Sequence, residues 1–152
     1  MTSFFNNYLF IFLAVLAGMA MPTQATVNSK LAGYVESPIS AAFISFAVGT
    51  IALFVYILLT GIPLSNLATS INAPLVAWIG GFLGAFFVSV MVTVVPRIGV
   101  ALTFSLAIGG QMLITLLIDH FGWLGAPEKP INLVRVLGAT LITIGVILIR
   151  KF

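Results

Sequence analysis

Two amide side chains, Gln24 and Asn28, are the residues of the first apolar stretch best suited to binding a polar solute. They stand four residues apart, so on a helix both lie on one face. Pro22 precedes them and removes one backbone donor, so a kink and a helix break are expected near Met19. Amides beside a helix break in a membrane can recognise a polar solute through hydrogen bonds.

The same two amides also fit a structural role. Amide groups facing lipid are costly, so this helix face should meet other helices or a polar cavity. In the structural interpretation Gln24 and Asn28 hydrogen-bond across a packed helix interface and Pro22 is a tolerated kink. The first stretch alone leaves both interpretations open.

Composition sets the class of protein. Hydrophobic residues make up 61% of the chain and charged residues 6%, against roughly 25% charged residues in soluble domains. The chain is therefore an integral membrane protein. With no cysteine, one histidine and three acidic residues, we expect no catalytic site, metal or cofactor. The net charge of +3 is small and scattered, which does not suggest nucleic acid.

Glycine, proline and charged residues divide the chain into apolar segments that must position these side chains. We predict one all-α transmembrane domain over residues 1–152. Its five membrane helices are expected at residues 4–32, 39–60, 75–95, 98–118 and 134–149. Ser37 is a candidate N-cap of the second helix and Pro38 suits its first turn. Pro96 is expected to end the third helix in a tight reversal.

Small and polar residues mark the faces on which these helices meet. Ala41, Ser45 and Gly49 recur every four residues in the second helix, a spacing that lets another backbone approach closely. Trp78 either packs between helices or lines a binding chamber, where its ring would suit organic cations. Gln111 suits an interhelical hydrogen bond, and it becomes a third convergent amide if it faces Gln24 and Asn28.

Basic residues indicate the orientation. Five spans place the two ends of the chain on opposite sides of the membrane. The N-terminal side then carries Lys129 and Arg135, and the other side carries Lys30, Arg97, Arg150 and Lys151. Since cytoplasmic loops are richer in Lys and Arg, this predicts a cytoplasmic C-terminus. The difference of two basic residues between the two sides is small, so both orientations can coexist in the membrane, which is called dual topology.

Several stretches resemble one superfamily. Residues 138–149 resemble the closing helix of drug/metabolite transporter (DMT) superfamily repeats of the EamA type. Residues 75–84, with Trp78 before a glycine cluster, are similar to a helix that lines the chamber of small multidrug resistance transporters. Along nearly the whole chain, residues 22–32, 45–50 and 116–123 resemble the YdcZ family of bacterial inner-membrane proteins.

The resemblance implies a half-transporter. One five-helix repeat would pair with a second copy or a close relative, in antiparallel (inverted) orientation, and enclose a substrate chamber between them. Small molecules would be exported through this chamber. Gly138 and Gly145, seven residues apart on one stripe, are the expected packing contact of that dimer.

One departure from the small multidrug resistance pattern concerns coupling. Those transporters carry a glutamate in helix 1, eight residues before a lysine, and here Pro22 stands at that distance before Lys30. Proton antiport through such a carboxylate is therefore in doubt. Asp119, with His120 beside it, is expected to be an interfacial cap or part of a local ion pair. Glu36 is an interfacial cap, part of a local ion pair, or a group at the chamber mouth.

The sequence therefore predicts a small homodimeric exporter that works by alternating access. Its substrate would be a small polar or amphipathic solute, and its other contacts membrane lipid. The binding site is expected at Gln24, Asn28, Trp78 and Gln111, with Glu36 as a further candidate. A non-transporting membrane subunit that recruits a partner through small-residue faces is the alternative. A membrane enzyme is a third, for which the sequence supplies no cluster of acid–base or metal groups.

Overall fold

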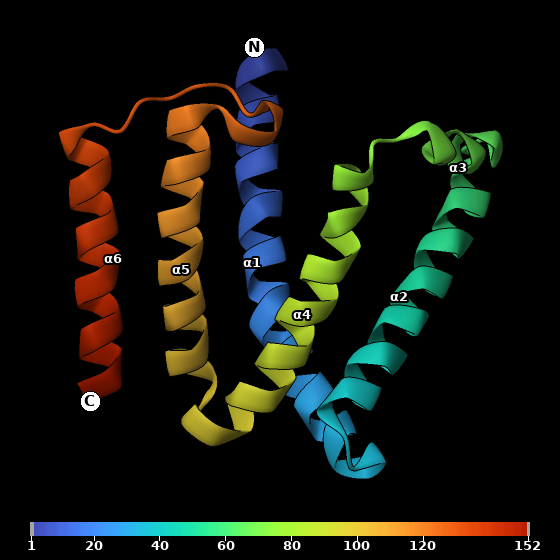
Figure 1. Ribbon diagram of the computed structural model, residues 1–152, viewed down its shortest axis with the longest axis horizontal. Helices are drawn as coiled ribbons and strands as arrows, with labels where there is room; N and C mark the ends of the chain where they lie inside the picture. The colour runs from blue at the N-terminus through green and yellow to red at the C-terminus, as the bar shows by residue number, and fades with distance from the viewer. Residues whose placement is uncertain (1, 152) are drawn as a thin grey trace. The chain divides into compact units, whose positions relative to one another are not determined.

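The computed structural model describes residues 2–151, with side chains from Tyr8 onward. Within this range every regular element is helical (Figure 1). Five helices are long and apolar enough to cross a membrane, which confirms the predicted all-α membrane fold. They are α1 (Thr2–Val35), α2 (Pro38–Thr60), α4 (Leu75–Ile98), α5 (Val100–Phe121) and α6 (Leu133–Lys151).

The chain forms two compact units, residues 1–97 and residues 98–152. The first contains α1, α2 and α4, together with the short helices α3 (Ser65–Ala68) and η1 (Thr69–Asn72). The second contains α5, η2 (Trp123–Gly125) and α6. The grouping of all five helices into one domain stays a prediction.

The turn between α1 and α2 is set by three consecutive residues. Glu36 follows α1 with φ 53°, in the left-handed conformation that often ends a helix. Ser37 is the N-cap of α2, and its Oγ accepts a hydrogen bond from the backbone N–H of Ser40 at 3.1 Å. Pro38 occupies the first turn, where its missing N–H costs nothing. The predicted start of the second helix is confirmed.

The core of the first unit lies near this turn, where α1, α2 and α4 meet. Its buried residues are Ala41, Ala42, Val88 and Val92, and partly buried side chains of α1 pack against them. Ala41 is fully buried, so the predicted close approach on α2 exists at this end. No neighbouring heavy atom among the described residues lies within 4 Å of a Cβ built at Gly49, and α2 and α4 diverge toward α3 (Figure 1).

Helix α4 continues through Pro96 to Ile98, so the prediction that Pro96 ends it was wrong. Proline in the last turn removes only the hydrogen bond to the carbonyl four residues earlier, which belongs to Val92. That oxygen accepts a hydrogen bond from Ser29 Oγ on α1 at 3.3 Å. The neighbouring helix therefore supplies the donor that proline lacks. The helix ends before Gly99, which has φ 84°.

Helix α1 also continues through its internal proline, Pro22. Two hydroxyls bond to carbonyls one turn earlier, Thr23 Oγ1 to Met19 at 3.0 Å and Thr26 Oγ1 to Pro22 at 2.8 Å. Such bonds often accompany a bend in a helix. The bend predicted near Met19 stays a prediction.

In the second unit α5 and α6 pack side by side (Figure 1). The connection between them is held by hydrogen bonds around Asp119 and Arg135, whose side chains form an ion pair at 3.2 Å. Arg135 Nη1 also donates to the backbone oxygen of Lys129 at 2.9 Å, and the Lys129 N–H donates to the Asp119 carbonyl at 2.7 Å. Phe121 and Trp123 stack in this connection, with ring centroids 5.2 Å apart.

Candidate functional site

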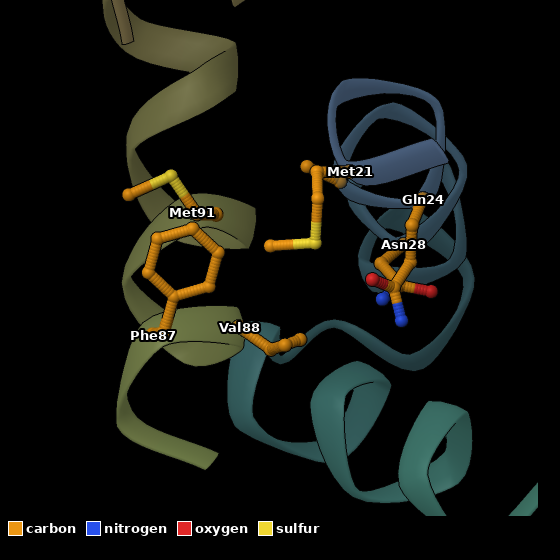
Figure 2. Close-up of a pocket in the computed structure, with 7 residues that line it drawn as sticks. Met21, Gln24, Asn28, Phe87, Val88 and Met91 are labelled. Carbon is orange, nitrogen blue, oxygen red and sulfur yellow. The ribbon is translucent and has the colours of Figure 1, made fainter. Parts of the chain in front are cut away.

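A small cavity between α1 and α4 is lined by both amides of α1 that were predicted to bind a solute, Gln24 and Asn28. Its volume is about 10 Å³, which is room for about one water molecule. Three of the residues labelled in Figure 2 come from α1 and three from α4. The lining consists of Met21, Gln24, Ala25, Asn28, Phe87, Val88 and Met91.

Asn28 is the buried polar residue of this cavity, with 4% of its surface exposed. Its Nδ2 donates a hydrogen bond to Ser45 Oγ on α2 at 3.0 Å. The small residues Ala25 and Ala41, both buried, accompany this contact between α1 and α2. The interhelical role predicted as one alternative is therefore present at Asn28. One amide hydrogen and the carbonyl Oδ1 of Asn28 are not used by this bond.

Gln24 lies one turn before Asn28 and lines the same cavity, but its side chain is exposed. Met21 reaches from α1 toward Phe87 and Met91 on α4 (Figure 2). Methionine side chains are flexible and fill irregular space, including space next to aromatic rings. The cavity thus has amides on the α1 side and deformable apolar side chains against α4.

The other predicted site residues do not line this cavity. Trp78 is on α4 and 53% exposed. It stands nine residues before Phe87, about 13 Å along the helix axis. Gln111 is exposed on α5 in the second unit, and Glu36 is exposed in the turn after α1. The convergence of these side chains with Gln24 and Asn28 stays a prediction.

The two glycines predicted to pack in a dimer have open space beside them. No heavy atom of the described chain lies within 4 Å of a Cβ built at Gly138 or at Gly145. Gly138 is exposed and contributes to a groove between α5 and α6. Their role in a dimer stays a prediction.

Two serines near the site were not identified as site residues from the sequence. Ser45, the partner of Asn28, was noted only for its small size in the four-residue spacing of α2. The single hydroxyl hydrogen of Ser29 is shared between two acceptors, the Ala25 carbonyl at 2.8 Å and the Val92 carbonyl on α4 at 3.3 Å. Polar side chains on adjacent apolar helices usually form hydrogen bonds with each other. The presence of a serine and an amide on neighbouring helices could therefore have indicated these contacts.

No cluster of three or more His, Asp or Glu side chains that could hold a metal occurs in the described part of the chain. The polar side chains that line the cavity are the amides of Gln24 and Asn28. These groups bind by hydrogen bonding and do not supply a general base or a nucleophile pair.

Comparison with known proteins identifies one family. A family model described as "Putative inner membrane exporter, YdcZ" matches residues 9–148. No curated protein and no solved structure matches the chain.

Proposed function

The chain belongs to the YdcZ family of inner-membrane exporters, and on this basis we propose that it exports a small polar or amphipathic solute by alternating access as a homodimer. It is a multi-pass inner-membrane protein with five membrane-spanning helices, and a membrane transporter. The observation that carries the proposal is the position of Gln24 and Asn28 at the cavity between α1 and α4.

In this proposal the cavity of about 10 Å³ is the closed form of the site. Binding sites for small molecules are typically some 300–1,000 Å³, so a solute requires α4 to move away from α1. Met21, Phe87 and Met91 are the side chains that must change position for this to happen. The hydrogen bond between Ser29 and Val92 joins the two helices beside the cavity, because these residues directly follow the lining residues Asn28 and Met91.

A second copy completes the chamber in this proposal. Trp78 and Gln111 are both exposed, which leaves them accessible to a partner chain or to a solute. The solute would be bound by Gln24 and Asn28, with the Trp78 ring and the Gln111 amide as further contacts. Glu36, at the turn after α1, would lie at the entrance.

The test compares Gln24→Leu with Thr26→Val in liposomes. Gln24 makes no hydrogen bond within the described residues, so losing its amide should not destabilise the fold. Thr26 is an exposed polar residue of the same helix and bonds only to its own helix, which makes it a matched control. A panel of polar and amphipathic metabolites is first screened for solutes that raise the melting temperature of the wild-type protein.

Flux of the best-stabilising solute is then measured for both variants. Losing one hydrogen bond to the solute should lower its affinity by about fivefold to tenfold in Gln24→Leu, and leave it unchanged in Thr26→Val. Equal flux in both variants would exclude Gln24 from the site. If no solute stabilises the wild-type protein and none is transported by it, the exporter proposal is contradicted and a non-transporting subunit is favoured.

The arrangement of the dimer is tested separately by crosslinking. The chain has no cysteine, so a single cysteine at Lys151 is the sole thiol. Antiparallel copies place their C-termini on opposite sides of the membrane, so no disulfide should join them although a dimer is present. Efficient disulfide formation between two such tails would show parallel copies and overturn the inverted arrangement.

A further inference from the structure

A groove of about 300 Å³ lies between α5 and α6 in the second unit. Its apolar part is formed by Met112, Leu116, Gly138, Ala139 and Ile142. Gly138 and Ala139 are the smallest side chains on this part of α6, and they leave the space between the helices unfilled. Its lining shares no residue with the cavity at Gln24 and Asn28.

One end of this groove carries charge. Asp119 and Arg135 belong to its lining and form the ion pair at 3.2 Å, with side chains 28% and 27% exposed. Asp119 is in the last turn of α5 and Arg135 in the first turns of α6, at the level where Phe121 and Trp123 stack. Aromatic residues of this kind are typical of the membrane–water interface.

The apolar part extends from the ion pair into the span. Met112 stands seven residues before Asp119, and Ile142 seven residues after Arg135. At 1.5 Å per residue the groove therefore reaches about 10 Å from the charges toward the middle of the helices. A charged end joined to an apolar channel matches an amphiphile with a polar head and an alkyl chain.

We propose that this groove binds a phosphatidylethanolamine molecule, with one acyl chain along Gly138 and Ala139 and the zwitterionic headgroup at Asp119 and Arg135. Arg135 Nη1 is engaged by Asp119 and by the Lys129 carbonyl, which leaves the Nε and Nη2 donors for the phosphate. The carboxylate of Asp119 is the acceptor for the ammonium group. Adjacent groups of opposite charge thus match a headgroup that carries both charges.

The charges favour this lipid over other occupants. An apolar helix of a second copy would cover the ion pair and remove it from water without replacing its hydration, which is costly. In this proposal the lipid therefore takes the place of the dimer contact expected at Gly138, and Gly145 lies outside the groove. A lipid headgroup brings its own charges to the pair. An anionic headgroup would find an attractive guanidinium but a repelling carboxylate within 3.2 Å of it.

The test measures lipid-dependent melting of the full chain in detergent. Phosphatidylethanolamine, phosphatidylglycerol and a diacylglycerol, all with the same acyl chains, are titrated in turn. Phosphatidylethanolamine should raise the melting temperature at about fivefold lower concentration than diacylglycerol. A fivefold difference in affinity is what about one contact between a basic side chain and a headgroup contributes. The proposal would be overturned if all three lipids raised the melting temperature at the same concentration. It would also be overturned if phosphatidylglycerol acted at a lower concentration than phosphatidylethanolamine.

Variants place the effect in the groove. Gly138→Leu fills the space beside Ala139. A Cβ built at Gly138 meets no neighbouring heavy atom of the described chain within 4 Å, so the substitution starts from open space. Gly145→Leu is the matched control because it has equal space on the same helix and lies outside the groove. Stabilisation by phosphatidylethanolamine should be lost in Gly138→Leu and kept in Gly145→Leu.

A second substitution, Ala139→Leu, fills the same groove and covers the case in which Gly138→Leu fails to fold. Unchanged stabilisation in either folded variant contradicts the proposal. Because these measurements use lipid and no transported solute, their failure leaves the exporter proposal untouched. Failure to transport any solute likewise leaves the lipid proposal intact.

Discussion

Ser29 and Val92 are joined by a hydrogen bond, from the serine hydroxyl on α1 to the backbone oxygen on α4, at 3.3 Å. Val92 is the residue whose helical partner is lost because Pro96 has no N–H. The two helices are therefore linked at a position where the proline of one exposes an acceptor and the other supplies a donor. Val92 is 1% exposed, so its oxygen has little access to water as an alternative.

Ser29→Ala is expected to lower the free energy of unfolding by about 1 kcal/mol, the typical value of one such hydrogen bond. The measurement is unfolding of the detergent-solubilised protein by a denaturing detergent. In a Pro96→Ala background the helix can supply its own donor to Val92, so Ser29→Ala should cost less there. An equal cost in both backgrounds would show that the hydroxyl acts elsewhere, for example on the Ala25 carbonyl.

Asn28 and Ser45 should be energetically coupled, because Nδ2 of Asn28 donates to Ser45 Oγ at 3.0 Å. Asn28→Leu and Ser45→Ala each remove one partner and leave the other polar group in an apolar contact. The double variant removes both polar groups. Its loss of unfolding free energy should therefore be about 1 kcal/mol smaller than the sum of the two single losses. Additive losses in a double-mutant cycle of unfolding free energies would mean that the bond contributes nothing.

Glu36→Gly is expected to stabilise the protein by about 1 kcal/mol, because residue 36 has φ 53° and glycine adopts that conformation without strain. Tyr34→Gly is the control, since Tyr34 is exposed within α1 and glycine there should cost about 1 kcal/mol. The readout is the melting temperature. A decrease for both variants would indicate that the Glu36 side chain contributes more than its backbone costs.

Gly122→Ala is expected to destabilise the connection after α5 more than Gly125→Ala does. Both glycines have positive φ, 61° and 81°, so both substitutions carry the backbone strain of about 1 kcal/mol. Only the Cβ at Gly122 meets another atom, Glu128 Cγ at 2.7 Å. Adding Glu128→Ala should therefore recover part of the loss in Gly122→Ala and none in Gly125→Ala, as judged by melting temperature.

The membrane helices were predictable because each is a long apolar run bounded by charge, glycine or proline. The start of α2 was also predictable, since Ser37 and Pro38 act through local backbone chemistry. The end of α4 was not, because Pro96 is accommodated by Ser29, which is distant in the sequence. The residues around Pro96 in the sequence do not reveal that a hydroxyl on another helix can bond to the exposed carbonyl.

The candidate site was predicted in part for the same reason. The four-residue spacing placed Gln24 and Asn28 on one face, and both line the cavity. Their helical periodicity could not reveal that Asn28 is bonded to Ser45, nor that Met21, Phe87 and Met91 reduce the space to about 10 Å³. Those facts depend on how α1 packs against α2 and α4.

The junction after α4 has a consequence for motion. Helix α4 ends at Ile98 and α5 begins at Val100, so the covalent link between the two compact units includes one non-helical residue, Gly99. Unless a helix end unwinds, any reorientation of one unit against the other must be absorbed by two torsion angles of that residue. Glycine has the widest allowed range of both angles, so the covalent link between the two units restricts the backbone less at this residue than any other amino acid would.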